Sequence, residues 1–116
     1  MKLRTLFFVA GLLWPASAFS QASHTTFRTG NELYESCISK TNSSQTNSAQ
    51  NIFCLAYVAG IFDALESLRM TCRPNEVTMG QAQDMIANYL RDHPEARHVA
   101  AADIVGSVLL KTFPCK

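Results

Sequence analysis

Four cysteines carry the most distinctive chemistry in this 116-residue chain: Cys37, Cys54, Cys72 and Cys115. Cysteine side chains form disulfides in oxidising compartments, hold zinc as thiolates, or act as nucleophiles. Their separations of 17, 18 and 43 residues include no CxxC pair of the kind that structural zinc sites use. A catalytic thiol would need one cysteine left unpaired beside a base. Two disulfides are therefore the predicted state, with no metal and no cofactor.

Other reactive residues give no pattern of a catalytic site. His93 and His98 are five residues apart, which favours a helix cap or a surface role over a shared metal site. The GxSxG, glycine-rich phosphate-binding and HExxH motifs are all missing, so the chain is predicted not to be an enzyme. A mixed-charge group around His93 is interpreted as a solvated turn without chemistry: Arg91, Asp92, Glu95 and Arg97.

The first residues have the pattern of a secretory signal peptide. Lys2 and Arg4 precede an apolar run, Leu6–Trp14, which is followed by small residues. This run is shorter than the roughly 20 residues that cross a bilayer, so we expect cleavage and no membrane span afterwards. Cleavage is predicted after Ala18, which defines a signal peptide of residues 1–18, with Ala22 as the second possibility. A retained signal anchor is the less favoured alternative.

The charge of the remaining chain argues against nucleic acid as a partner. Removing residues 1–18 leaves 98 residues with eight basic and nine acidic side chains. A nucleic-acid-binding domain needs a clustered basic face, which this balance does not supply. The remaining length fits one domain with a modest core.

The apolar pattern that must position the cysteines predicts an all-α domain of about four helices. The first lies within Thr29–Lys40. The second begins at Ile52, is apolar or glycine through Phe62, and is expected in the centre of the fold. The third follows Thr78, which forms a predicted capping box with Gln81. The fourth ends before Pro114. For the first, third and fourth helices, the positions predicted to be buried are Leu33, Tyr34, Cys37, Ile38, Met79, Ala82, Met85, Ile86, Tyr89, Leu90, Ala101, Ile104, Val105, Val108 and Leu109.

Two polar segments interrupt the helical pattern. Thr41–Asn51 is uncharged and holds a single alanine, so it is predicted to be a solvated loop. Met70–Val77 contains Pro74 and Asn75 and breaks the pattern before the third helix. Within the second and fourth helices, Gly60 and Gly106 are interpreted as points where helices approach closely.

Helix geometry restricts how the cysteines pair. A continuous helix rises about 1.5 Å per residue, so Cys54 and Cys72 would be roughly 27 Å apart. A disulfide needs Cα atoms within about 7 Å, which excludes that pair. Because the first two helices should pack antiparallel, we favour Cys37 with Cys54 and Cys72 with Cys115. The remaining alternative joins Cys37 to Cys72 and Cys54 to Cys115.

Several motifs together resemble one family. CLAYVAGIFDAL, CRPNEVTMGQ, YLRDHPEARH and the closing FPC occur in the order seen in the Rap/Tai family of type VI secretion immunity proteins. The resemblance covers about Gly30 to Cys115 and implies a helical immunity-type domain at residues 29–116. It also implies a periplasmic, disulfide-bonded protein that binds and blocks a cognate peptidoglycan amidase effector. Members of the family are often dimers, so a homodimer is a further expectation.

The motifs do not identify the residues that would contact such an effector. A flexible polar projection is the kind of element that enters an enzyme cleft, which makes the segment Thr41–Asn51 a candidate and the segment after Cys72 a second one. The partner-binding residues predicted on this basis are Asn42, Ser43, Ser44, Gln45, Asn47, Arg73, Asn75 and Glu76. A plain solvated connector is the competing interpretation of both segments. The alternative function is a periplasmic helical chaperone or stress protein with the same scaffold and no effector partner.

Overall fold

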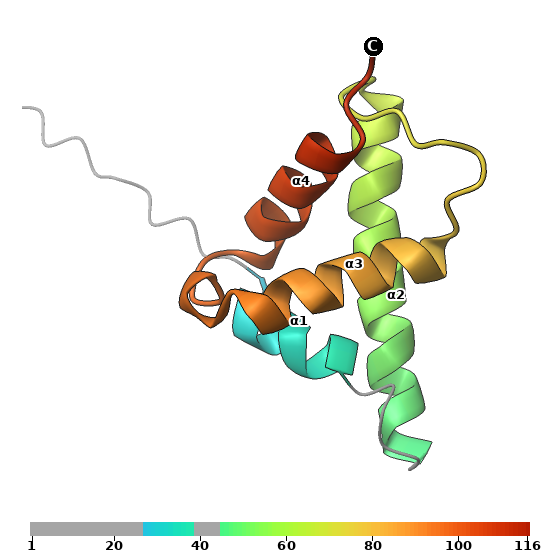
Figure 1. Cartoon of the computed structure of the whole chain (residues 1–116). Helices are drawn as coiled ribbons and strands as arrows, with labels where there is room; N and C mark the ends of the chain where they lie inside the picture. The colour runs from blue at the N-terminus through green and yellow to red at the C-terminus, as the bar shows by residue number, and fades with distance from the viewer. Residues whose placement is uncertain (1–26, 39–44) are drawn as a thin grey trace, which may run out of the picture.

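The computed structural model describes residues 27–38 and 45–116, with side chains in the second range described from Ala49 onward. These residues form the helices α1 (Gly30–Cys37), α2 (Gln45–Ser67), α3 (Met79–Asp92) and α4 (Ala101–Thr112). A 3₁₀ turn, η2 (Pro94–Ala96), connects α3 to α4. The described part of the chain is therefore all-α, as predicted (Figure 1).

Two helices begin at side-chain caps that satisfy otherwise unpaired backbone N–H groups. The Thr78 hydroxyl accepts from the Gln81 N–H at 3.2 Å, and the Thr78 N–H donates to Gln81 Oε1 at 2.8 Å, which confirms the predicted capping box. The same arrangement joins Thr29 and Glu32 at the start of α1. The hydrogen bond that the Thr29 N–H donates to the Glu32 carboxylate lowers the pKa of that carboxyl group.

The longest helix, α2, packs against each of the other three α-helices, and α3 crosses it (Figure 1). One buried cluster joins all four helices. Its central side chains are fully enclosed and come from α2 (Cys54, Val58 and Phe62), α1 (Leu33), α3 (Ile86 and Leu90) and α4 (Val105 and Leu109). The prediction that the second helix lies at the centre of the fold is confirmed for this face.

The opposite face of α2 is exposed, so the central position predicted for the apolar segment Ile52–Phe62 does not hold for all of its residues. The Ile52 side chain is 63% exposed, and Ala56 and Gly60 are also exposed. A domain with three partner helices covers only part of a 23-residue helix. In the described part of the chain, no helix combines the length and the apolar content needed to cross a membrane.

Both favoured disulfides are present. Cys37 at the end of α1 bonds Cys54 in α2, with Cα atoms 5.1 Å apart. Cys72, after α2, bonds Cys115, after α4, with Cα atoms 4.8 Å apart. All four cysteines are therefore paired, and the alternative connectivity is wrong.

Three local predictions are corrected by the structure. Residues Gln45–Asn51, predicted to be loop, form the first turns of α2, because a helix anchored downstream by a packed core extends into polar residues that cannot form a helix alone. Ile38, predicted to be buried, follows the end of α1 at Cys37 and is 41% exposed. In α3, Gln83 is buried although it was not predicted, and its amide donates to Asn51 Oδ1 at 2.6 Å.

The start of α1 is fixed against the chain between η2 and α4. The N–H of Gly30 donates to the Val99 carbonyl at 2.9 Å, and that of Asn31 donates to the Arg97 carbonyl at 2.8 Å. Gly30 is buried, and a Cβ atom there would lie 2.8 Å from the Arg97 Cα and carbonyl oxygen. Close approach thus occurs at Gly30. It does not occur within the described domain at Gly60 or Gly106, where an added Cβ meets nothing within 4 Å.

One buried polar group gives a prediction about stability. The Thr71 residue is 2% exposed, and its hydroxyl has no hydrogen-bond partner among the described residues. An unsatisfied buried hydroxyl costs about 1–3 kcal/mol, so Thr71→Val is expected to raise the free energy of unfolding by about 1 kcal/mol. Urea denaturation monitored by circular dichroism measures this change. A loss of stability would show that the hydroxyl has a partner in solution, such as ordered water.

Candidate functional site

The connection between α2 and α3, residues 68–78, is the candidate site and is called the 68–78 loop below. It arches away from the helices in Figure 1, where it is drawn in yellow. It starts with a tight turn in which the Arg69 N–H donates to the Glu66 carbonyl and the Met70 N–H donates to the Leu65 carbonyl, both at 2.9 Å. This is the helix-ending turn that normally contains glycine. Arg69 adopts it with φ of 57°, which places a non-glycine residue in the left-handed region.

The base of the loop is fixed to the segment after α4. The Cys72–Cys115 disulfide joins the two covalently, and the Cys72 N–H donates to the Phe113 carbonyl at 2.9 Å. Thr71 and Pro114 form an isolated β-bridge beside it. The Phe113 ring stacks on the buried Phe62 ring at 5.2 Å between centroids, which connects this junction to the core.

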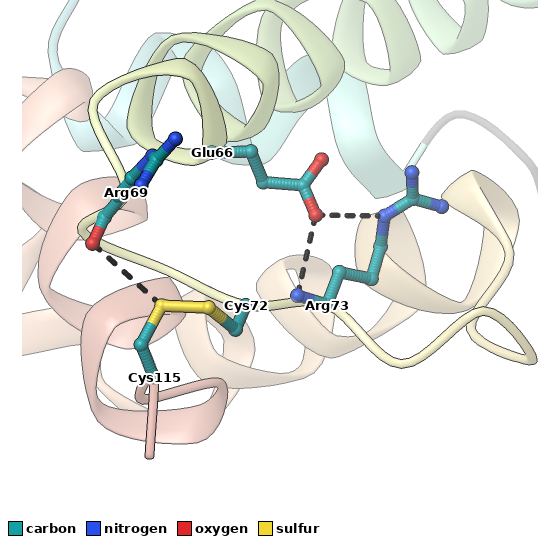
Figure 2. The surroundings of a disulfide bond; sticks show 5 residues. All are labelled: Glu66, Arg69, Cys72, Arg73 and Cys115. Atoms are coloured by element: carbon teal, nitrogen blue, oxygen red, sulfur yellow. Dashed lines mark hydrogen bonds and ion pairs between the residues drawn. A yellow bond between two sulfur atoms is a disulfide. The ribbon is translucent and has the colours of Figure 1, made fainter.

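Arg73 stabilises the part of the loop that follows Cys72. Figure 2 shows its side chain and backbone N–H turned toward the Glu66 carboxylate at the end of α2. The backbone N–H donates to Glu66 Oε1 at 3.2 Å and the guanidinium Nε to the same oxygen at 3.4 Å. The guanidinium Nη1 donates to the Val77 carbonyl at 3.0 Å, across the loop. The guanidinium also lies 5.6 Å above the Phe62 ring, so Arg73 holds both ends of the loop tip against the core.

The tip itself is a hydrogen-bonded turn. The Val77 N–H donates to the Pro74 carbonyl at 3.0 Å, and the two central residues, Asn75 and Glu76, are exposed. Proline restricts the backbone at the start of this turn, and Arg73 restrains its far end. An amide and a carboxylate are therefore presented on a short projection whose backbone is already ordered. Such a projection loses little conformational entropy when a partner binds it.

Apolar side chains flank this polar tip at the other end of the loop. Leu68 is 69% exposed and Met70 is 48% exposed. Next to the disulfide lies a cleft of about 470 Å³ lined by Cys72, Arg73, Pro74, Thr112, Phe113, Pro114 and Lys116. Protein interfaces combine apolar anchors with a polar rim, so this end of the molecule has the composition of a binding surface.

The region around η2 has a structural role that the sequence did not indicate. Arg97, interpreted above as part of a solvated turn, donates from Nε to the Leu90 carbonyl and from Nη2 to the Arg91 carbonyl, and its guanidinium lies 3.6 Å from the centroid of the Tyr34 ring. It therefore terminates α3 and joins it to α1. His93 and His98 both contact Glu95, through its carboxylate and its carbonyl respectively. Over residues 27–38 and 45–116, no three His, Cys, Asp or Glu side chains converge to hold a metal ion.

The predicted partner-binding residues fall into two separate groups. Asn42, Ser43 and Ser44 lie outside the described residues, while Gln45 and Asn47 are in the first turns of α2. Arg73, Asn75 and Glu76 are together in the 68–78 loop, where Asn75 and Glu76 are exposed and Arg73 is half-buried. Sequence reasoning missed Glu66 and Phe113, which hold this loop. Arg73 lies seven positions after Glu66 and beyond the end of α2, so the spacing of helical side chains does not predict this pair.

The chain matches the model of a known protein family. The model of the family described as Rap1a immunity proteins matches residues 29–115, which includes all four helices and both disulfides. No curated protein and no solved structure matches the chain.

Proposed function

Because the chain belongs to the Rap1a immunity protein family, we propose that it binds and inhibits a cognate peptidoglycan amidase effector of a type VI secretion system. The family supports the role of an immunity protein, which acts on an effector protein by binding it. Immunity proteins are not normally catalytic, and the proposed inhibition is stoichiometric. The effector class and the secretion system are the parts that an experiment must establish.

The 68–78 loop is the observation that carries the proposed mode of binding. Its tip presents Asn75 and Glu76 on an ordered turn, and Arg73 and the Cys72–Cys115 disulfide fix its base. An active-site cleft is concave, so a short convex element that is ordered before binding is suited to block it. We place the main effector contact on Arg73, Asn75 and Glu76. A second contact is proposed at Asn42, Ser43, Ser44, Gln45 and Asn47.

The place of action in this proposal is the periplasm. A secretory signal peptide is proposed at residues 1–18, and its removal leaves all four cysteines in the mature chain. Two disulfides are the form that a small domain takes in an oxidising compartment. A peptidoglycan amidase acts on the cell wall, so inhibitor and substrate would share that compartment.

The test begins with capture of the effector. The oxidised mature chain serves as bait for cell-wall enzymes in a periplasmic extract, and each captured protein is assayed for peptidoglycan cleavage with and without the bait. One tight partner whose cleavage is inhibited is the expected result. Absence of a stable partner, together with protection of many unfolded proteins at low pH, would favour the chaperone alternative.

A double substitution then tests the loop. Asn75→Ala with Glu76→Ala is expected to weaken effector binding at least about tenfold, equivalent to about 1.4 kcal/mol, because it removes the polar groups of the tip. Isothermal titration calorimetry measures the affinity. The matched control is Asn31→Ala with Glu35→Ala, an exposed amide and carboxylate on α1. Equal affinities for both variants and the unmodified chain would place the contact elsewhere, and alanine substitution of the five residues at 42–47 then tests the second proposed contact.

We further propose that the chain forms a homodimer through the exposed face of α2. Ile52, Ala56 and Gly60 are exposed on that face, and α2 carries no charged residue before Asp63. Ala56→Arg is expected to convert the dimer to a monomer, because it would place two charges at the centre of the interface. Analytical ultracentrifugation measures the change. A monomer at micromolar concentration before any substitution would contradict the proposal.

A further inference from the structure

The two disulfides differ sharply in their access to solvent. The residue exposures of Cys37 and Cys54 are 2% and 0%, whereas Cys72 and Cys115 are both exposed. Reduction of a disulfide begins when a thiolate attacks one of its sulfur atoms, so the rate depends on whether that sulfur can be reached. Cys37 and Cys54 belong to the core cluster, so the second bond is the more accessible of the two while the domain is folded.

The exposed bond holds a junction rather than the core. It joins the 68–78 loop to the segment Phe113–Lys116, and the remaining ties at this junction are the Cys72–Phe113 backbone hydrogen bond, the Thr71–Pro114 bridge and the stacking of Phe113 on Phe62. The helices α1, α2 and α3 contact one another without it. Opening this bond therefore leaves their packing in place.

Backbone strain lies beside the same bond. Arg69 has φ of 57°, an unfavourable conformation for a side chain with a Cβ atom, and its carbonyl oxygen lies 3.6 Å from Cys115 Sγ (Figure 2). The turn at Arg69 is separated from the disulfide by only Met70 and Thr71.

We propose that Cys72–Cys115 is a redox-sensitive clasp that a dithiol reductant opens selectively. The first reductant thiolate attacks one sulfur, forms a mixed disulfide and releases the other cysteine as a thiolate, which takes up a proton. The second reductant thiol displaces the remaining cysteine, and the reductant leaves as a disulfide. Two electrons pass to the protein. The segment Phe113–Lys116 then separates from the 68–78 loop, while Cys37–Cys54 keeps α1 on α2.

This clasp also has a consequence for binding, which rests on the function proposed above. Asn75 and Glu76 are ordered because the base of their loop is fixed on one side by Cys72 and on the other by Arg73. Loss of the covalent tie makes the tip more mobile, so more conformational entropy is lost on binding. The reduced form is therefore expected to bind the effector at least about tenfold more weakly than the oxidised form.

The order of reduction is measured on the mature oxidised chain without any effector. The protein is incubated with dithiothreitol under native conditions, quenched with acid, alkylated and mapped by mass spectrometry. Cys72 and Cys115 are expected to become alkylated at least about tenfold faster than Cys37 and Cys54. Hydrogen exchange of the partly reduced protein is expected to accelerate at the Cys72 amide and through the loop, while amides of α1 and α3 stay protected.

Equal rates for the two bonds, or unchanged exchange at the Cys72 amide after its bond is open, would overturn the clasp. A Cys72→Ser/Cys115→Ser variant provides the permanently open form, and its exchange pattern must match that of the selectively reduced chain. These measurements do not involve an effector, so they test the redox proposal independently of the proposed function. If the clasp opens as expected but effector affinity is unchanged, the link to binding is wrong and the redox behaviour remains.

Discussion

Replacing Cys37 and Cys54 together by alanine is expected to unfold the domain at about 37 °C. Closing the loop between these cysteines contributes about 3 kcal/mol in the chain-entropy model, and small domains have a total stability of about 5–15 kcal/mol. The sulfur atoms are also part of the core, so their removal leaves a cavity that adds to the loss. We expect a combined cost of about 5 kcal/mol.

The shortness of α1 explains why this bond matters so much. With eight residues, α1 is not stable as an isolated helix and depends on Leu33, Cys37 and its capping box to stay in place. Once it detaches, the core faces of α2 and α3 that it covers are opened to water. The loss of one covalent tie therefore spreads through the domain.

Far-ultraviolet circular dichroism and thermal unfolding measure the effect. The comparison is Cys72→Ala/Cys115→Ala, which removes the longer loop closure, worth about 4 kcal/mol, but no buried sulfur. That variant is expected to keep its helical signal at room temperature with a lower melting temperature. If the Cys37/Cys54 variant keeps its full helical signal and melting temperature, helix packing alone stabilises α1.

Replacing Gly30 by alanine is expected to destabilise the domain by about 3 kcal/mol, the upper end of the usual range for overpacking. The added Cβ would lie 2.8 Å from the Arg97 Cα and carbonyl oxygen and 2.5 Å from the Ile104 side chain. Ile104 can rotate, but Arg97 is held in place by the hydrogen bonds that its guanidinium donates to the Leu90 and Arg91 carbonyls at the end of α3. The start of α1 must then move away from the Arg97 backbone.

Gly106→Ala is the matched control, because it makes the same chemical change in α4 where an added Cβ meets nothing within 4 Å. Alanine is favoured over glycine inside a helix by about 1 kcal/mol, so this variant is expected to be more stable than the unmodified chain. Urea denaturation gives both values. Equal effects of the two substitutions would contradict the close contact at Gly30.

The candidate site was predictable only in part. Pro74 and Asn75 mark a turn in the sequence, and the Thr78–Gln81 pair marks the helix that follows it, so the position of the 68–78 loop could be inferred. The rigidity of this loop could not be inferred from the sequence. Glu66 and Phe113 hold the loop from the end of α2 and from beyond α4, and no short-range pattern connects either residue with Cys72 or Arg73.

The sequence by itself determined that the described domain is helical, most of the buried positions of its helices, and that Cys54 does not pair with Cys72, because helical spacing and rise are local properties. The choice between the two remaining disulfide pairings rested on the expected antiparallel packing of α1 and α2, and the structure decided it. Only the tertiary structure decided where α2 begins, which of its faces stays open, and which glycine is needed for close packing. These features depend on contacts between segments distant in the chain. Packing on the core extends α2 through Gln45–Asn51, three neighbouring helices leave Ile52 uncovered, and the approach of Arg97 makes Gly30, rather than Gly60 or Gly106, the position that excludes a side chain.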